Sequence, residues 1–404
     1  MKNHSVKLIF EMMRPAGVAM AKRVLLVRGG SLGRNTGLGA AHHNLVDMLN
    51  SGQIEGWELA GQCEYPLSKT SNPFSRLWNR WISHPRRVAK LAKQLVGQGK
   101  CDLVHITDQE QSHLVPDNCG VPVTITVHDL FHLFPQYLQI GDDSIEVGDT
   151  KPGLLRRRDL KKLRHGLTKA DFLMCNSMHT HQASKKNFSD VPSVCIPMGI
   201  DVAKYHPDNQ QLEDIKMPAT CNLLIVGSND PRKRMKFLCQ VIGNLPDNVK
   251  KQVHIHHVGN GASNSGLPPI MEIAKQNGID NWTQHGSSVS DEYLMTLRMK
   301  CEALLFPSVS EGFGYPPIES MAAGMKVICA DLPSHNELMP DGTCIPADDS
   351  KAWSQAIINL HTQWQAMDGN QEQRAPEASL LKHAMKYDNK VFCNRLAEAY
   401  DSIV

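Results

Sequence analysis

Residues 303–324 read ALLFPSVSEGFGYPPIESMAAG, and this stretch decides the fold class. Residues 303–306 form an apolar run with the length of a buried strand, and a glycine-containing loop follows it. Two adjacent prolines suit the first turn of a helix, and Gly324 is placed to end that helix. Glu311 therefore lies in the loop and Glu319 in the expected first helical turn, so that two carboxylates flank one helix N-terminus.

The same alternation of short apolar runs with helical patterns continues on both sides of this stretch. We expect strands at residues 23–28, 102–106, 122–127, 171–175, 193–196, 222–227, 253–258, 303–306 and 326–330. We expect helices at residues 38–50, 86–97, 154–169, 233–244, 290–300, 317–323, 351–363 and 389–403. This alternation predicts an α/β protein whose parallel sheets are covered by helices on both faces.

The length of 404 residues exceeds what one hydrophobic core usually holds, which indicates two domains. The alternation pauses around residues 197–216, and a second series of strands and helices then begins. We therefore expect two Rossmann-like domains facing each other across a cleft, with the ligand site at the carboxyl ends of their strands. The expected parts are a loose extension at 1–20, a first domain at 21–205, a second domain at 206–388 and a C-terminal helix at 389–404 that packs back on the first domain.

The composition excludes several classes of protein. Hydrophobic residues make up 41% and charged residues 21% of the chain, which excludes a disordered or fibrous protein. The longest apolar runs have the length of strands, so we expect no membrane-spanning helix, and the apolar run near the N-terminus is too short for a signal peptide. The 11 cysteines include no C-x-x-C pair, which favours reduced thiols in a cytoplasmic protein and gives zinc no ligand spacing.

The turn after the first expected strand has the features of an anion site. Residues 29–39 read GGSLGRNTGLG, and glycines there let backbone N–H groups approach an anion at a helix N-terminus. The spacing differs from the dinucleotide motif G-x-G-x-x-G. A plain surface loop with helix-start glycines is the alternative.

A second turn, at the start of the second domain, is cationic. Residues 226–234 read VGSNDPRKR. Pro231 suits the first helical position, but three cations in the first turn of a helix oppose its dipole. A bound diphosphate would offset that repulsion, and a solvated cationic turn is the alternative.

These segments together resemble the family 4 retaining glycosyltransferases, which share the two-domain GT-B fold. The stretch at 306–324 resembles the E-x7-E motif of that family, and residues 226–233 are similar to its V-G-x-x-x-P-R-K turn. Residues 194–201 resemble its P-x-G-[IV]-D linker. Residues 126–130 resemble the T-x-H-D-L turn of its polysaccharide-type members, which are often mannosyltransferases. The resemblance runs from about residue 23 to residue 400.

The resemblance implies a role for each matching residue. Glu311 would hold the hydroxyls of the donor sugar, and Glu319 would hold the ribose hydroxyls of the nucleotide. Arg232 and Lys233 would neutralise the diphosphate leaving group, and His128 would lie beside the reacting centre. The remaining donor-binding positions are Gly37, Gly39, Gly227, Ser228, Gly312, Phe313 and Gly314. Some relatives carry an arginine where this chain has Ser228, so leaving-group stabilisation would depend on Arg232 and Lys233.

The expected activity is the transfer of a hexose, with retention of configuration, from a nucleotide diphosphate sugar to a hydroxyl acceptor in glycan, polysaccharide or glycolipid biosynthesis. The His-Asp turn at residues 128–129 favours mannose from GDP-mannose. With no clear protein nucleophile, we expect same-face substitution assisted by the leaving phosphate. The chain contains no D-x-D motif, so we expect neither a metal nor another cofactor. His254, His256 and His257 fit a strand better than a metal site.

Other functions remain open from the residues alone. A sugar phosphorylase or a nucleotide-sugar epimerase could use the same fold, and two close carboxylates would also suit a hydrolase. A non-catalytic nucleotide-binding module would keep the glycine turns but would not need both glutamates.

The charge distribution suggests a further partner. Residues 1–205 carry 26 basic and 18 acidic side chains, whereas the remainder carries 17 and 23. No acidic residue lies between Glu64 and Asp102, a stretch that includes Trp78 and Trp81, and residues 154–169 place seven cations on a leucine-bearing helix. We expect this domain to face a saccharide or lipid-linked acceptor at the anionic inner face of a membrane. Ordinary solvated helices are the alternative, and no nucleic-acid recognition motif is present.

Overall fold

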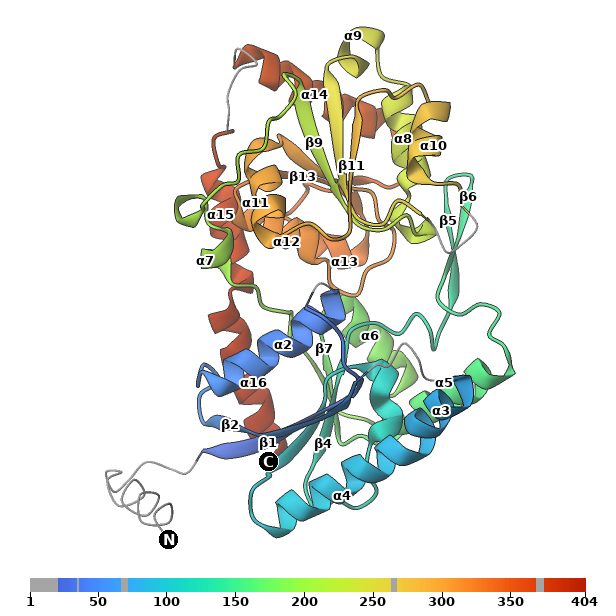
Figure 1. Cartoon of the computed structure of the whole chain (residues 1–404), viewed down its shortest axis with the longest axis vertical. Coiled ribbons are helices and arrows are strands. Elements are labelled where there is room, and N and C mark those ends of the chain that lie inside the picture. Colours follow the sequence, from blue (N-terminus) through green and yellow to red (C-terminus); the bar gives the residue numbers. More distant parts are fainter. Residues whose placement is uncertain (1–20, 35, 67–71, 263–266, 368–373) are drawn as a thin grey trace.

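The computed structural model describes residues 21–34, 36–66, 72–262, 267–367 and 374–404. These residues form two lobes, and the chain returns to the lower lobe at its C-terminus (Figure 1). Each lobe contains a parallel sheet with helices on both faces, so the expected α/β class with two Rossmann-like domains is confirmed. The extension expected at residues 1–20 lies outside the described residues.

The first sheet has the strand order β2-β1-β3-β4-β7-β8, and every neighbouring pair is parallel. Its strands are β1 (Lys22–Gly30), β2 (Trp57–Tyr65), β3 (Leu103–Ile106), β4 (Val123–Val127), β7 (Phe172–Cys175) and β8 (Ser193–Cys195). The helices of this lobe are α2 (Gly37–Asn50), α3 (Pro73–Trp78), α4 (His84–Gly97), α5 (Leu154–Lys169) and α6 (Met178–Asn187), with a π-helical segment η1 (Asn79–Ser83) and a 3-10 helix η2 (Gln109–Leu114).

The second sheet has the order β11-β10-β9-β12-β13-β14 and is also parallel. Its strands are β9 (Cys221–Val226), β10 (Val253–Val258), β11 (Trp282–Gly286), β12 (Ala303–Phe306), β13 (Lys326–Asp331) and β14 (Ile345–Pro346). Around it lie α8 (Met235–Gly243), α9 (Asp247–Lys250), α10 (Ile270–Gln276), α11 (Asp291–Lys300), α12 (Tyr315–Ala322), α13 (Pro333–Asn336) and α14 (Ser350–Ala366), and the short helix α7 (Val202–Tyr205) precedes it.

Strand β1 shows how the sheets are buried on both faces. Val24 and Leu26 belong to one apolar cluster, Leu25 and Val27 belong to another, and all four side chains are fully buried. Successive residues of a strand point to opposite faces, so a strand covered on both sides reads as a continuous apolar run. The cluster around Val24 and Leu26 also contains residues of β9 and β12, so one core runs through both lobes.

The last helices connect the two lobes. α15 (Ala378–Ala384) lies in the upper lobe, and α16 (Asn389–Ile403) runs along the lower one (Figure 1). The Asp401 carboxylate accepts hydrogen bonds from Lys22 Nζ (3.2 Å) and Trp57 Nε1 (3.1 Å). The Tyr400 hydroxyl lies 2.6 Å from His105 Nδ1. These contacts fasten the end of the chain to strands β1, β2 and β3.

Several elements differ from the sequence prediction. Strands β2, β11 and β14 were not expected, and each lies at the edge of its sheet. Edge strands are partly exposed and mix polar with apolar residues, as in WELAGQCEY of β2, so they lack the apolar run that marks a central strand. The hairpin of β5 (Gln136–Ile140) and β6 (Asp143–Val147) was also not expected; it extends from the lower lobe to the upper one (Figure 1).

The described part of the chain includes no helix that is long and apolar enough to cross a membrane.

Candidate active site

The candidate site lies where the carboxyl ends of strands from both lobes meet. At this place Gly312, in the loop after β12, lies against His128, directly after β4. A Cβ atom added to Gly312 would lie 2.1 Å from the His128 carbonyl oxygen and 3.5 Å from the side-chain amide nitrogen of Asn176, which follows β7. Only a glycine therefore lets the two lobes approach this closely.

Glu311 is the buried centre of an ion cluster. Its Oε2 atom lies 3.0 Å from Arg232 Nη1, and its Oε1 atom accepts hydrogen bonds from Lys233 Nζ and from the Ser308 hydroxyl (2.6 Å). Burial alone would raise the pKa of Glu311, but the charges of Lys233 and Arg232 outweigh it and lower the pKa to about 2. Glu311 is therefore ionised, and the buried part of the cluster has two cations for one carboxylate. A second and more exposed carboxylate, Asp230, lies 3.7 Å from Arg232 Nε.

The two cations lie on a turn that differs from the expected one. Pro231–Lys233 form a separate 3-10 helix, η4, whose first N–H groups are capped by Asp230 through a 3.1 Å bond from Arg232 N. Arg234 then adopts a left-handed conformation with φ 52°, and α8 begins only at Met235. The prediction of three cations in the first turn of a helix was wrong, so their repulsion by its dipole does not arise. Two of the three cations, Arg232 and Lys233, instead bond to the Glu311 carboxylate.

Burial acts on Lys233 in the opposite direction from Glu311. It lowers the pKa of the Lys233 ammonium, and the nearby Glu311 carboxylate only partly offsets this effect. The ammonium also lies 5.2 Å from the centre of the Phe306 ring at the end of β12. An additional anion at this position would favour the charged form of the lysine.

Glu319 has different partners from Glu311. Helix α12 starts at Tyr315, so Glu319 lies in its second turn and not in the first turn as expected. Its carboxylate accepts hydrogen bonds from Arg298 Nη2 and from the Tyr205 hydroxyl (3.1 Å). The Arg298 side chain is only 3% exposed, while that of Glu319 is 19% exposed. The Glu319 carboxylate is therefore fixed by Arg298 and Tyr205 and is still partly exposed to solvent.

Sequence reasoning missed Arg298 and Tyr205. Arg298 lies on α11 among Met295, Leu297 and Met299, all of which are buried. A single arginine among apolar helix positions is a signal of a buried charge that needs a partner, but it does not name that partner. The partner became visible only because α11 and α12 pack in the same lobe.

His128 turns its ring away from Gly312. The backbone N–H of His128 donates to Gln109 Oε1 (2.8 Å), and its ring Nε2 lies 3.1 Å from the Thr107 carbonyl oxygen. The ring lines a cavity of about 20 Å³ inside the first domain, together with His42 and His105. The main chain of His128, and not its ring, is therefore the part that faces the second domain.

The predicted glycines of the first turn differ in their surroundings. The Gly39 N–H donates to the Thr36 hydroxyl (3.1 Å), which caps α2, and a Cβ on Gly39 would lie 2.0 Å from the Gly33 carbonyl oxygen. Gly37 has no atom within 4 Å of its Cβ position. The start of α2 points toward the upper lobe (Figure 1). Gly39 thus shapes the turn, whereas Gly37 has open space.

The remaining predicted positions surround the cluster or shape its loops. Gly227 has φ 150°, and its carbonyl oxygen accepts a 2.7 Å hydrogen bond from His257 Nε2. Ser228 is exposed. Phe313 is buried with its ring against Tyr315, and Gly314 adopts φ 111° at the start of α12.

A pocket beside the Gly227 turn was not predicted. It has a volume of about 360 Å³ and lies at the carboxyl ends of β10 and β11, lined by Gly259, Asn260, Gly261, Ala262, Pro269, Ile270, Met271, Gln284, Gly286 and Ser287. A Cβ on Gly259 would lie 1.9 Å from the Gly227 carbonyl oxygen, so the pocket adjoins the cationic turn. The sequence VGNG at 258–261 was the available signal, since glycines after a strand often accompany a ligand.

The histidines of β10 bond to side chains of the neighbouring strands. His256 lies 3.0 Å from Asn222 Oδ1 and 3.1 Å from His285 Nε2, and His257 bonds to Gln284 as well as to Gly227. Across the described ranges, no group of three or more histidine, cysteine, aspartate or glutamate side chains is placed to hold a metal ion.

Comparison with known proteins identifies the family. Residues 56–204 match the family model described as Glycosyltransferase Family 4, and residues 220–363 match the model described as Glycosyl transferases group 1. The chain is 44% identical over 73 residues to O-antigen chain mannosyltransferase RfbU of Salmonella typhimurium, a match that covers 18% of this chain and 21% of that one. It is 29% identical over 137 residues to O-antigen chain mannosyltransferase B of Escherichia coli, covering 33% and 35%. The chain thus spans about a fifth to a third of the length of these curated relatives.

Solved structures agree with this family at the level of the fold. Sucrose-phosphate synthase from Thermosynechococcus elongatus superposes with a TM-score of 0.68 at 16% identity, over 94% of this chain and 98% of that one. Anabaena Alr3699/HepE in complex with UDP-glucose superposes with a TM-score of 0.62 at 15% identity, over 95% and 100%. The chain therefore belongs to the family 4 glycosyltransferases and has their GT-B fold.

Proposed function

We propose that this glycosyltransferase moves a hexose, with mannose favoured, from a nucleotide diphosphate sugar to a hydroxyl acceptor in polysaccharide or glycolipid biosynthesis, with retention of configuration. The observation that carries the proposal is the buried cluster of Glu311 with Arg232 and Lys233, placed against His128 of the other domain. Mannosyltransferases among the relatives and a structural neighbour that holds UDP-glucose support it.

The cluster suggests how a donor would bind. The diphosphate would compete with Glu311 for Arg232 and Lys233, because it carries more negative charge than one carboxylate. Glu311 would then be free to accept hydrogen bonds from the sugar hydroxyls. The same two cations would stabilise the charge that develops on the departing diphosphate, which is the main electrostatic task of the reaction.

The nucleoside would lie on the other side of the cationic turn. The 360 Å³ pocket adjoins Gly227 and has the size of a small-molecule site. Glu319, held by Arg298 and Tyr205 with its carboxylate partly exposed, would accept hydrogen bonds from the ribose hydroxyls. Gly37, at the open start of α2, would donate from the opposite lobe.

The reaction would be a same-face substitution. The bond from the anomeric carbon to the diphosphate oxygen breaks, and the acceptor hydroxyl oxygen bonds to the same face of that carbon. The leaving phosphate oxygen takes the proton of the acceptor hydroxyl. The protein supplies charge, orientation and exclusion of water, and no protein nucleophile or metal ion takes part.

We also propose that the first domain binds an anionic membrane surface on the cytoplasmic side, where a lipid-linked acceptor would be found. Phe74, Trp78, Leu154 and Leu155 are exposed by 75%, 51%, 82% and 58%. Helix α5 lies against η1, since Arg158 and Lys162 contact the Trp81 ring. Helices α4 and α5 of the same domain carry exposed cations, namely Arg86, Arg87, Lys90, Arg157, Arg158, Lys161 and Arg164. Aromatic side chains among cations are typical of an interfacial surface.

The first experiment is a thermal-shift screen of the purified protein with GDP, UDP, ADP, TDP and their sugars in the presence of EDTA. A ligand at about 100 times its Kd adds roughly 2.7 kcal/mol to the stability of the folded protein. Stabilisation by one base, followed by metal-free transfer of its sugar with retention at the anomeric carbon, is the expected result. A folded sample that no nucleotide stabilises, or a product of inverted configuration, contradicts the proposal. A strict need for inorganic phosphate would identify a phosphorylase instead.

The membrane proposal has its own test. The wild type should sediment with vesicles of phosphatidylcholine and phosphatidylglycerol but not with phosphatidylcholine alone. Phe74→Ser/Trp78→Ser should weaken that binding, and Met367→Ser, which changes an exposed apolar residue of the other lobe, should not. Equal sedimentation of all three proteins would argue against this surface.

A further inference from the structure

The β5–β6 hairpin belongs to the first domain by sequence but docks on the second. It leaves the first domain shortly after the His128 turn and reaches the upper lobe (Figure 1). At its tip, Gly141 has φ 57°, and a Cβ on Gly141 would lie 3.4 Å from the Cβ of Asp348 in the second domain. The hairpin therefore bridges the two lobes.

The hairpin depends on the second domain for its apolar contacts. Ile145 and Val147 are 6% and 2% exposed and belong to the same apolar cluster as strands β9 and β10. Leu138 and Ile140 pack against that cluster. A two-stranded hairpin alone is at best marginally stable in water, so this one gains its order from the domain on which it docks.

The polar contact of the hairpin is with Arg234, the residue directly after Lys233. Arg234 has a left-handed backbone, its side chain is 3% exposed, and its Nη1 donates to the Ala347 carbonyl oxygen. Its Nη2 atom lies 3.4 Å from Asp143 Oδ2 on β6. A buried guanidinium needs a nearby negative charge. Here Asp143 of the first domain supplies the ion pair, and the charge of Asp348 in the second domain also acts on Arg234.

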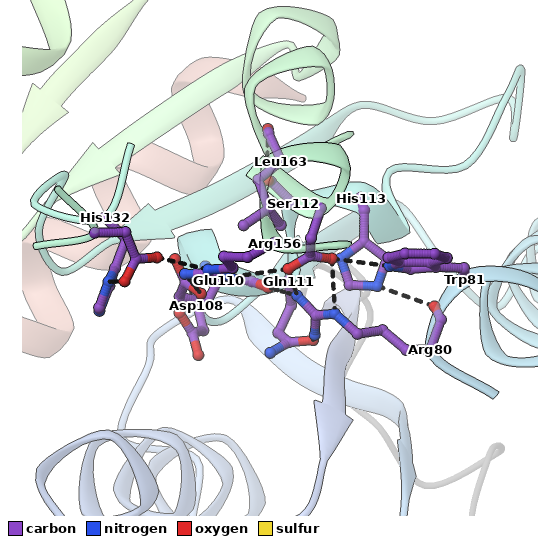
Figure 2. Close-up of polar contacts among 12 residues, drawn as sticks. Arg80, Trp81, Asp108, Glu110, Gln111, Ser112, His113, His132, Arg156 and Leu163 are labelled. Atoms are coloured by element: carbon purple, nitrogen blue, oxygen red, sulfur yellow. Dashed lines mark hydrogen bonds and ion pairs between the residues drawn. The ribbon is translucent and has the colours of Figure 1, made fainter. Parts of the chain in front are cut away.

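The base of the hairpin is fastened to the first domain. Gly148 has φ 88°, and a Cβ there would lie 1.9 Å from the Phe131 carbonyl oxygen, so the two ends of the segment close on each other. The next residue, Asp149, accepts a 2.6 Å hydrogen bond from Arg156 Nε and lies 3.2 Å from His132 Nδ1. Figure 2 shows Arg156 continuing this chain of contacts to Glu110.

We propose that this hairpin is a positioning strap, in which Asp143 of the first domain holds Arg234 and thereby fixes the Arg232–Lys233 turn for the diphosphate. The inference rests on the proposed function and adds the residues that orient its cations. Asp143 and Arg234 are positioning residues and need not touch the donor. Because Ile145, Val147 and Arg234 fasten the strap to the second domain, movement between the lobes should bend the segments at its base.

The test compares diphosphate with monophosphate binding by full-length protein. Calorimetric titrations with GDP, UDP, GMP and UMP would use wild type, Asp143→Asn, Asp143→Glu and Asp142→Asn. Asp142 is the neighbouring residue of the same turn, and it is exposed. Melting temperatures of all four proteins verify folding. A residue that merely stabilises the fold would not distinguish the two kinds of nucleotide.

We expect Asp143→Asn to weaken diphosphate binding on the order of tenfold, as when a charge network is uncoupled, and to leave monophosphate binding nearly unchanged. Asp143→Glu should recover most of the loss, and Asp142→Asn should behave as wild type. Diphosphate binding by Asp143→Asn at the wild-type affinity, or an equal loss for both nucleotide types, overturns the strap. Wild-type protein that binds none of the four nucleotides overturns the proposed function for these donors and the strap with it.

Discussion

Two ion clusters, one in each domain, differ in the balance of their charges. In the second domain, Glu311 is the buried carboxylate between two cations, Arg232 and Lys233, and the more exposed Asp230 lies 3.7 Å from Arg232. In the first domain, Arg156 bonds to three carboxylates, and Arg80 shares one of them. Trp81 Nε1 donates to the shared carboxylate, and His113 Nε2 lies against the Arg80 carbonyl oxygen (Figure 2). The first-domain carboxylates are Glu110, Asp149 and Asp159.

The difference in charge balance explains why one cluster is a candidate ligand site and the other a structural network. A cluster with surplus positive charge can accept an anionic ligand, because the ligand improves its electrostatic energy. In the first-domain cluster three carboxylates outnumber two guanidinium groups, so the cluster does not attract a phosphate and instead holds η1, η2 and α5 together. The sign of the surplus, and not burial alone, therefore distinguishes a candidate site from a structural network.

The strongest test of the comparison removes the surplus charge. Lys233→Ala should lower the rate of sugar transfer by about a hundred- to a thousandfold, because one of the two groups that stabilise the leaving diphosphate is lost. Initial rates with the donor found in the thermal screen measure this. Lys236→Ala, which removes an exposed lysine of the neighbouring helix, is the matched control. Equal rates for Lys233→Ala and wild type would remove the second-domain cluster from the mechanism.

A second test alters the contact between the domains beside that cluster. Gly312→Ala would place a methyl group 2.1 Å from the His128 carbonyl oxygen. We expect the lobes to separate slightly, with a loss of roughly 1–3 kcal/mol in transition-state stabilisation or in stability. Transfer rates and thermal melting separate the two effects. Gly97→Ala, at a position with open space in α4, should leave both quantities unchanged; wild-type behaviour of Gly312→Ala would show that the approach is not needed.

The first-domain cluster should respond in stability and not in ligand binding. Asp159 is 9% exposed and bonds to Arg80, Arg156 and Trp81. Asp159→Asn should therefore cost about 1–3 kcal/mol of unfolding free energy, because two guanidinium groups lose a charged partner. Urea unfolding measures the loss, and Glu55→Gln changes an exposed carboxylate as a control. If nucleotide affinity falls instead while stability holds, the assignment of the two clusters is reversed.

The smallest effect is on the pH dependence of stability. The pKa of Glu311 is lowered to about 2 from an ordinary 4.5. As the pH falls, the unfolded chain therefore binds a proton before the folded chain does, and the stabilisation of the folded state by ionised Glu311 is lost from about pH 4.5 toward about pH 2. Burial raises the pKa of Glu110, with Arg156 only partly offsetting it, so Glu110 acts in the opposite direction. Unfolding of wild type and Glu311→Gln between about pH 6 and about pH 3 should show a weaker acid destabilisation in the variant. Parallel curves would mean that Glu311 is not held ionised by its cations.

The local pattern of the chain was predictable to a large extent. The central strands β1, β9 and β12 contain apolar runs of strand length, and α5 and α16 were expected at their observed bounds. The edge strands β2 and β11 were missed because they mix polar with apolar residues, and β14 was missed because it has only 2 residues. The β5–β6 hairpin was missed because its apolar residues are buried by the other domain, which no local pattern describes.

The sequence by itself determined which residue types stand at the ends of the strands: the loop with Glu311, the Arg232–Lys233 turn and the His128 turn. Only the tertiary structure decided their partners. Lys233 and Glu311 lie 78 positions apart, and Arg234 and Asp143 lie 91 apart. The first pair forms because a parallel sheet brings the carboxyl ends of distant strands to one edge. The second forms because the β5–β6 hairpin docks on the second domain. The energy of an ion pair depends on that distance and on burial, and both are properties of the folded chain.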